Sequence, residues 1–328
     1  MKIKLSELDV LAVKALQKYG YDVQEIAVIK EILMYAQLRG NNQGLVKLIG
    51  RGIPKSPDAK PIEIVRDTKL SALLKRNNNM GMIVFKKAME MAVAKAKKHG
   101  FGMVGTNNTS SSTGAIGYYA HGIAKQGYIS FVFAGSPETV NTYGSYEPIF
   151  GTNPLAIGVP TTKDPIVLDM ATASMAYYGL IEAKTAGKKI PHDIAYDSEG
   201  NLTDDPAKAM DGALRPFDKN YKSAGLSFMV EVLTGPLVGA SFTGIGDTAK
   251  NWGNLIVALD PELLTDKEQF KKNVSVMAQK VKATKKLLGV KEIFVPGERG
   301  DRLTKERMAS GTIDIEDNLY HELQKVTQ

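Results

Sequence analysis

The order of hydrophobic patterns along the 328-residue chain is the feature that most restricts its fold. Apolar residues recur at helical spacing over residues 5–20 and 22–40, and again from Asp266 onward. After Gly100 the texture changes to short buried strand patterns, at residues 101–104, 128–134, 155–159, 166–168 and 255–259. Strands and helices do not alternate regularly, which argues against a doubly wound parallel sheet. The pattern predicts a mixed α and β unit between two helical ends.

Local signals add detail to these elements. Ser6 with Asp9, and Asp22 with Glu25, have the spacing of a capping box at a helix start. Further helices are predicted over residues 81–99 and, as a buried helix, over 226–233. In the C-terminal helix, one face carries Phe270, Val274, Met277 and Val281. Residues 293–295 are predicted to form a strand.

Composition excludes several classes of protein. The chain has no cysteine, and its four histidines are not at metal-ligand spacing, so neither disulfides nor a metal site is expected. The net charge of +7 raises the question of nucleic acid. The basic residues are dispersed, however, and Lys95, Lys97 and Lys98 share a helix with Glu90. The apolar stretch 226–240 is too short to span a bilayer. We expect a cytoplasmic protein without nucleic-acid or membrane partners, whose positive field favours a small anionic substrate.

Two glycine strings imitate the dinucleotide fingerprint. Residues 100–105 read Gly-Phe-Gly-Met-Val-Gly, and residues 244–249 read Gly-Ile-Gly-Asp-Thr-Ala. The fingerprint must follow a strand and open a helix, so that backbone N–H groups meet the pyrophosphate. The first string instead ends a helix, and no strand precedes the second. Neither predicts a Rossmann site. A serine-rich loop, residues 106–114, does leave a strand and open a helix. Two interpretations stay open for it: its free backbone N–H groups bind an anion, or it is a plain capped loop.

Five ordered strings carry a resemblance to a known family. They are Gly114-Ala115-Ile116-Gly117-Tyr118-Tyr119, Gly151-Thr152-Asn153-Pro154-Leu155, Leu168-Asp169-Met170-Ala171-Thr172, Lys222-Ser223-Ala224-Gly225-Leu226 and Val295-Pro296-Gly297-Glu298. In this order they resemble the malate/L-lactate dehydrogenase-like oxidoreductases. That family includes ureidoglycolate, sulfolactate and diketogulonate oxidoreductases and lacks the Rossmann fold of other lactate dehydrogenases.

The resemblance implies a fold and an activity. The fold is α+β, with a mostly antiparallel-sheet cofactor domain at 73–264 and a helical domain built from both termini, 1–72 with 265–328. The implied assembly is a homodimer with the active site near the interface. The implied activity is that of an enzyme, a dehydrogenase acting on CH–OH with NAD, or alternatively NADP. It interconverts a small 2-hydroxy acid, of the malate, lactate or ureidoglycolate kind, and its 2-oxo acid.

The resemblance also assigns residues one by one. The positions that line the NAD site in the family are matched by Ser136, Asp169, Met170 and Ala171. Lys222 matches a lysine at the nicotinamide end, where it would polarise a carbonyl or stabilise an alkoxide. A loop over the dinucleotide is matched by Pro296, Gly297, Glu298 and Arg299.

The chain departs from the family at the reacting centre. Where the family has a Ser-His-Gly string followed by an arginine, this chain has Asn41-Asn42-Gln43-Gly44 and then Lys47. Ser112 stands where the family has a second histidine. Gln43 and Ser112 form hydrogen bonds but do not titrate near neutral pH. Lys47 would hold the substrate carboxylate, without the bidentate fork of arginine.

Three alternatives therefore remain open for the chemistry of this chain. Lys222 relays it, together with Ser112 and Gln43 at the reacting centre, or His121 substitutes for the missing histidines. In the third alternative, the reaction is altered or lost, and the chain is a binding or regulatory protein that keeps its cofactor site.

Overall fold

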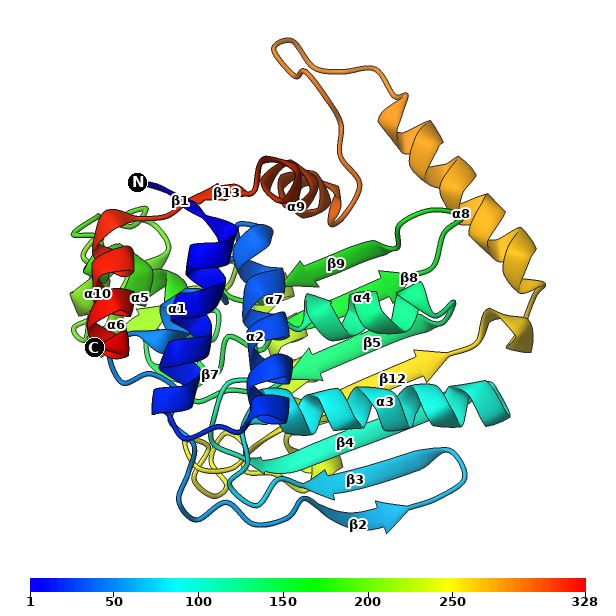
Figure 1. Ribbon diagram of the computed structural model, residues 1–328, viewed down its shortest axis with the longest axis horizontal. Helices are drawn as coiled ribbons and strands as arrows, with labels where there is room; N and C mark the ends of the chain where they lie inside the picture. The colour runs from blue at the N-terminus through cyan, green and yellow to red at the C-terminus, as the bar shows by residue number, and fades with distance from the viewer.

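A seven-stranded sheet forms the centre of the computed structural model, which describes residues 1–328 (Figure 1). Its strand order is β2-β3-β4-β12-β5-β8-β9, and only the β3–β4 pair is parallel. The prediction of an α+β fold with a mostly antiparallel sheet is thus confirmed. The strands are β2 (Glu63–Asp67), β3 (Ser71–Lys75), β4 (Phe101–Thr109), β5 (Ile129–Ala134), β8 (Leu155–Val159), β9 (Ile166–Met170) and β12 (Trp252–Leu259).

The directions of these strands bring five chain ends to one edge of the sheet. Strands β4 and β5 both run antiparallel to β12, so they end at the edge where β12 begins. Phe133 near the end of β5 pairs with Leu155 at the start of β8, and Leu155 pairs with Met170 at the end of β9. The loops that leave or enter these strands therefore meet at this edge.

Helices cover both faces of the sheet. The side chains of β12 point alternately to the two faces and show which helices lie on each. Ile256 and Ala258 pack with helices α3 (Gly81–His99) and α4 (Gly117–Lys125), which lie in front of the sheet in Figure 1. Leu255 and Val257 belong to the opposite face, with Val238 of η2 (Pro236–Val238). Helix α7 (Tyr221–Thr234) also contacts β12 and β5 there.

Both chain termini contribute to a helical layer at one end of the sheet (Figure 1). It contains α1 (Leu5–Lys18), α2 (Val23–Leu38), α9 (Glu298–Ser310) and α10 (Asp317–Thr327), and β1 (Lys2–Lys4) pairs with β13 (Thr312–Asp314). One core of 44 buried residues runs from these helices through α3 into the sheet. The predicted boundary at residue 72 falls inside β3, and the division into two domains stays a prediction.

A smaller four-stranded sheet faces the helical layer across the edge of the large sheet. It pairs β10 (Ala195–Tyr196), β11 (Ala213–Leu214), β6 (Val140–Asn141) and β7 (Pro148–Phe150). A separate cluster of nine buried residues joins it to α5 (Tyr177–Thr185) and α6 (Pro206–Asp211). The 3-10 turn η1 (Leu45–Leu48) contacts α5 and thereby connects this unit to the helical layer.

Several local predictions are settled by the structure. The capping box of Asp22 and Glu25 is confirmed, whereas α1 begins after Lys4 and has no side-chain cap, so the Ser6 prediction is wrong. Residues 293–295 form no strand. On α8 (Lys267–Lys282), which projects from the body after η3 (Pro261–Leu263), only Val274 is buried. Helix α7 is buried on one side only, since Phe228 and Met229 are exposed.

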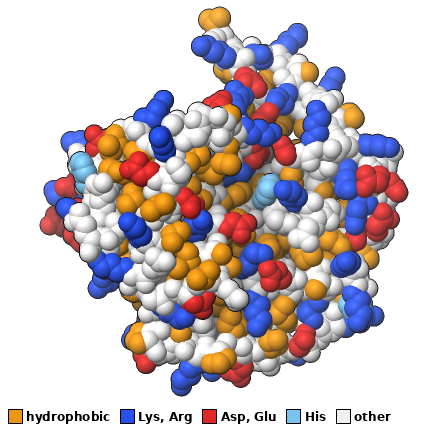
Figure 2. Space-filling view, in the orientation of Figure 1, with side chains coloured by type: hydrophobic (Ala, Val, Ile, Leu, Met, Phe, Trp, Pro, Cys, Tyr) orange, Lys and Arg blue, Asp and Glu red, His pale blue; other side chains and the backbone are white.

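Basic and acidic side chains are intermixed over the face shown in Figure 2, without a single basic patch there. None of the helices combines the length and the apolar character needed to cross a bilayer.

Gly102 tests the packing of α3 on β4. A Cβ atom there would lie 2.0 Å from the carbonyl oxygen of Ala92, so Gly102→Ala must push helix and strand apart. We expect a loss of about 1–3 kcal/mol in the free energy of unfolding, measured in urea. Lys97→Ala, at an exposed position of the same helix α3, is the control, because no packing against β4 changes there, and it should be close to neutral. Equal midpoints for the two variants would contradict the packing described here.

Candidate active site

Two adjoining cavities lie at the sheet edge where the five strand ends meet. One, of about 630 Å³, is named here the asparagine cavity because Asn41 and Asn42 line it. The other, of about 550 Å³, is the lysine cavity, lined by Lys47. Four residues line both, namely Gln43, Gly114, Thr152 and Pro154. The two spaces therefore meet along one junction.

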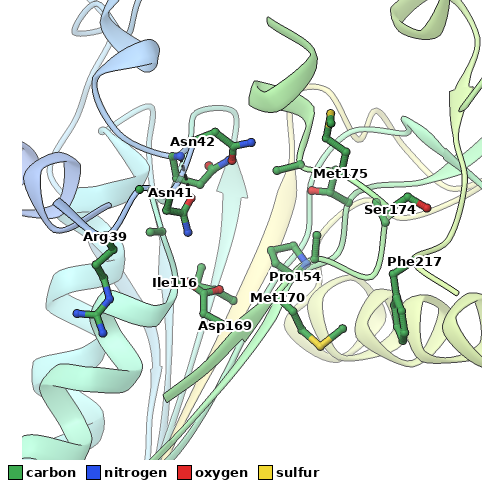
Figure 3. A pocket seen from close by; sticks show the side chains of 18 residues that line it. Arg39, Asn41, Asn42, Ile116, Pro154, Asp169, Met170, Ser174, Met175 and Phe217 are labelled. Carbon is green, nitrogen blue, oxygen red and sulfur yellow. Dashed lines mark hydrogen bonds between the residues drawn. The ribbon is translucent and has the colours of Figure 1, made fainter. Parts of the chain in front are cut away.

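The asparagine cavity opens between the helical layer and the smaller sheet. Figure 3 shows Asn41 and Asn42 across the opening from Ser174 and Met175, with Asp169 between them at the strand end. Arg39 lies at the rim, where it pairs with Asp301 of α9 and stacks on the Tyr35 ring at 4.5 Å. The predicted cofactor residues Asp169, Met170 and Ala171 all line this space.

Asp169 is a carboxylate held inside the cavity wall. Its Oδ2 accepts the backbone N–H of Gly117 at 2.9 Å, and a Cβ at Gly117 would collide with it at 2.6 Å. Burial raises the pKa of Asp169 to about 6, against the opposing effects of the Gly117 N–H and of Arg39. The group therefore titrates within the range of ordinary assays.

The start of α4 presents backbone donors to the same cavity. Ser112 accepts the N–H of Gly114 and Asp169 accepts that of Gly117. Between them, the N–H groups of Ala115 and Ile116 have no acceptor within the protein. Both residues line the asparagine cavity. Free donors at a helix start favour a negatively charged group.

The lysine cavity is built on the turn that follows α2. The backbone N–H of Leu45 donates to Oε1 of Gln37 at 3.0 Å, which folds the turn back onto α2. Gly44 permits this approach, since a Cβ there would lie 2.4 Å from the same oxygen. This fold of the turn directs Lys47 inward, and the residue is only 1% exposed.

Lys47 is a buried base without a partner. Its Nζ lies 3.3 Å from the centroid of the Tyr178 ring and makes no hydrogen bond. Burial lowers the pKa of Lys47 well below its ordinary 10.5. The side chain of Lys47 lines the cavity, and an unpaired buried base there is suited to an anionic ligand or to proton exchange with one.

Arg76 positions the serine-rich loop on the other side of the lysine cavity. Its Nη1 and Nη2 donate to the hydroxyls of Ser110 at 2.8 Å and Ser111 at 2.6 Å. Ser111 also accepts the N–H of Gly81 at the start of α3, at 2.9 Å. Ser112 follows directly and lines the cavity.

The structure thus brings together many of the residues predicted from sequence. Gln43, Lys47, Ser112 and Ser136 line the lysine cavity. The Ser136 hydroxyl accepts the N–H of Thr152 at 3.0 Å and so fixes the loop between β7 and β8 that lines the junction of the two cavities. Pro296 and Glu298 line a third cavity, of about 430 Å³, between α9 and the β8–β9 turn. Gly297 and Arg299 line none of these three spaces.

Two candidate proton carriers lie elsewhere in this single chain. Lys222, in the first turn of α7, is exposed and lines neither cavity. His121, on α4, packs 5.9 Å from the Tyr35 ring and also lines neither. Burial and the nearby Arg39 lower the pKa of His121, which keeps the imidazole neutral at physiological pH.

Sequence reasoning missed several residues that line the site or pack beneath it. Tyr178 beneath Lys47 gave no signal, because only the fold brings α5 onto the turn after α2. Phe217 and Ser174 are equally distant in the chain. Thr152 and Pro154 at the junction, by contrast, stand within a string that carried the family resemblance.

Comparisons with known proteins identify the family of the chain. A sequence profile described as malate/L-lactate dehydrogenase matches residues 3–324. A malate/(S)-sulfolactate dehydrogenase of Methanothermus fervidus is 33% identical, over 96% of this chain and 94% of that protein. A ureidoglycolate dehydrogenase (NAD(+)) of Escherichia coli K12 is 30% identical, over 98% and 95%. The crystal structure of malate dehydrogenase from Entamoeba histolytica matches with a TM-score of 0.90 at 25% identity, covering 100% of this chain and 97% of that one. The chain belongs to the malate/L-lactate dehydrogenase family.

Proposed function

We propose that this dehydrogenase uses NAD to interconvert a small anionic 2-hydroxy acid and its 2-oxo acid, with NADP as the alternative cofactor. The observation that carries the proposal is the junction of the two cavities. The asparagine cavity has the residues and donors for a dinucleotide, and the lysine cavity has an unpaired basic nitrogen for an anion. The relatives named above act on malate, sulfolactate or ureidoglycolate.

The asparagine cavity fits a dinucleotide in size and in chemistry. Its volume of about 630 Å³ is within the range of small-molecule sites. The free N–H groups of Ala115 and Ile116 complement a pyrophosphate, and the Asp169 carboxylate is suited to accept ribose hydroxyls. The bound nicotinamide supplies or accepts the hydride. Met170 and Ala171 would pack against the cofactor, and Gln43 would lie near its reactive end.

The lysine cavity would hold the substrate. Lys47 would bind its carboxylate, while the Gln43 amide and the Ser112 hydroxyl orient the oxygen that changes between alcohol and carbonyl. Ser136 lies on the same wall. Burial in this cavity strengthens each of these polar contacts because little water screens them.

Lys222 and the loop from Pro296 to Arg299 would complete the site. Lys222 lies in the first turn of α7, five residues after Phe217 of the asparagine cavity. The family resemblance implies a lysine at the nicotinamide end in this position, and an active site near the dimer interface. The exposed apolar side chains of α7, including Phe228 and Met229, provide a surface that a second copy would cover. We further propose a cytoplasmic location.

The first test is direct. Titration with NAD and NADP, followed by fluorescence of the single Trp252 in the lysine cavity, should show binding. Turnover of a panel of 2-oxo acids with NADH and NADPH should follow. Binding without turnover would favour the alternative of a binding or regulatory protein. Absence of both would contradict the proposal.

Lys222→Ala tests the assignment made through the resemblance. We expect weaker NAD binding or at least a tenfold lower turnover, because a positive charge near the nicotinamide end is lost. Lys250→Ala, at a lysine that is 83% exposed, is the matched control. Unchanged affinity and unchanged rate in Lys222→Ala would remove Lys222 from the site.

NAD affinity should depend on the ionisation of Asp169. The ionised carboxylate accepts hydroxyl hydrogen bonds more strongly than the neutral acid. Because the pKa of Asp169 is raised to about 6, affinity should rise as the pH increases from 5 to 8. Asp169→Asn should bind about tenfold more weakly at pH 8 and lose this dependence. An equal pH dependence of Kd in both proteins would exclude this role.

We expect a homodimer in solution. Light scattering at micromolar concentration should give twice the chain mass of 35.6 kDa. Met229→Asp on the exposed face of α7 should shift the mass toward the monomer, because a buried unpaired charge is costly at an interface. A wild-type mass of one chain would contradict the dimer.

A further inference from the structure

The state of Lys47 in the lysine cavity goes beyond what a carboxylate anchor needs. An anchor needs a lasting positive charge, which an arginine at this position supplies at every physiological pH. Lys47 instead is 1% exposed and has neither an acidic partner nor a hydrogen bond. The structure thus places an unpartnered basic side chain in the wall of the cavity proposed for the substrate.

We propose that Lys47 is the proton donor and acceptor of the reaction, a catalytic role that rests on the function proposed above. In the oxidation, the neutral amine accepts the hydroxyl proton while the hydride leaves the same carbon for the nicotinamide. One O–H and one C–H bond break, while one N–H bond, the second C–O bond of the carbonyl and a new C–H bond on the hydride acceptor form, and both electrons travel with the hydride. In the reduction, the ammonium returns its proton to the carbonyl oxygen.

Both protonation states of Lys47 are accessible in this environment. Burial favours the neutral amine, whereas the π face of Tyr178, at 3.3 Å, favours the ammonium. No acidic group pairs with Lys47. The other titratable groups on the cavity walls are Tyr177, Tyr178, Glu138 and Asp211. Of those on elements packed against η1, Tyr19 of α1 donates to the carbonyl oxygen of Leu48, and Glu182 of α5 and Glu316 before α10 line a separate cavity with Val46.

The alternatives in the cavity are less suited to carry the proton. Gln43 and Ser112 do not titrate in the working range. Burial raises the pKa of Tyr178 and so keeps the phenol neutral. Glu138 is engaged by the hydroxyl of Thr248, and Asp211 is exposed at the end of α6. Lys47 is the one group there whose buried state brings its ionisation toward neutrality.

Anchoring and proton transfer are compatible in one nitrogen. The carbonyl and carboxylate groups of a 2-oxo acid stand on adjacent carbons, so one ammonium can donate to an oxygen of each. The two roles nevertheless predict different behaviour when lysine is replaced by arginine, which keeps the charge but does not release a proton.

The decisive variant is Lys47→Arg, with Lys189→Arg, at a lysine that is 80% exposed, as the control. We expect Lys47→Arg to keep its Kd for NAD and to lose about a hundredfold or more in kcat, the scale of general acid–base catalysis. The wild-type profile of kcat/KM for oxidation should rise with pH to a plateau below the ordinary lysine pKa, and Lys47→Arg should lose this inflection. A kcat within threefold of wild type, with only KM changed, would overturn the proposal.

Two further measurements do not depend on the fold of that variant. In Lys47→Ala, added primary amines should restore turnover, with rates that follow the basicity of the amine. In the wild-type protein with ¹³C-lysine, the Lys47 side-chain NMR signal should titrate below the ordinary value of 10.5 without cofactor or substrate. A signal that stays protonated up to pH 10 would overturn the proposal even if NAD binding and turnover are normal. A wild-type protein that binds neither NAD nor NADP would instead contradict the function on which this rests.

Discussion

The antiparallel pairing of β12 with both β4 and β5 is the constraint on which the other parts of the structure depend. Because β12 lies between them, β4 and β5 run in the same direction and end at one edge of the sheet. The serine-rich loop leaves β4 there, and the segment with Ser136 leaves β5 there. Strand β9 ends at the same edge with Asp169 and Met170. The two cavities are the space that these strand ends enclose with the turn after α2.

Charge in the site is arranged by burial more than by pairing. Lys47 and Arg76 lie on the two sides of the lysine cavity and its serine-rich loop, and neither meets a carboxylate. Each of these groups costs free energy when it is charged in the folded protein without a counterion. The family departures at Gln43 and Ser112 fit this arrangement, since neutral side chains replace groups that would add further charge. A site with this character lowers the cost of bringing in an anion, whose charge compensates what the protein leaves uncompensated.

Much of the fold could be predicted from sequence, because its signals are local. The capping box of Asp22, the helix from Gly81 to His99 and five of the seven strands of the large sheet follow from spacing and composition, whereas β2 and β3 were not predicted. The prediction that the glycines at 100–105 end a helix and lead into a strand is confirmed, since Gly100 caps α3 with a φ of +79° and β4 follows directly. Ser6 did not cap α1, because the chain enters the helix from β1, which is held by β13.

The candidate site was less predictable, since it depends on contacts between distant segments. The family resemblance pointed to Gln43, Lys47 and Ser112 as site residues, but the sequence did not predict that Lys47 is buried. That burial requires Gly44 against Gln37 and Tyr178 from a helix more than a hundred residues later. The sequence pattern of residues 293–295 suggested a strand, yet this segment does not pair with the free edge of β9, although Gly297 lies against Val167 of that strand. The apolar residues of α8 show the same limit, since periodicity reports an apolar face and not what covers it.

The central place of β12 also affects how the chain is made. Its residues pair with strands that leave the ribosome much earlier, as Asn254 and Thr109 are 145 residues apart. At usual synthesis rates this separation corresponds to roughly 7–30 s. Throughout that interval, the inner edges of β4 and β5 lack their partner and present unpaired backbone groups to the surrounding solution. The nascent chain is therefore most prone to pairing with other chains until β12, in its last quarter, emerges.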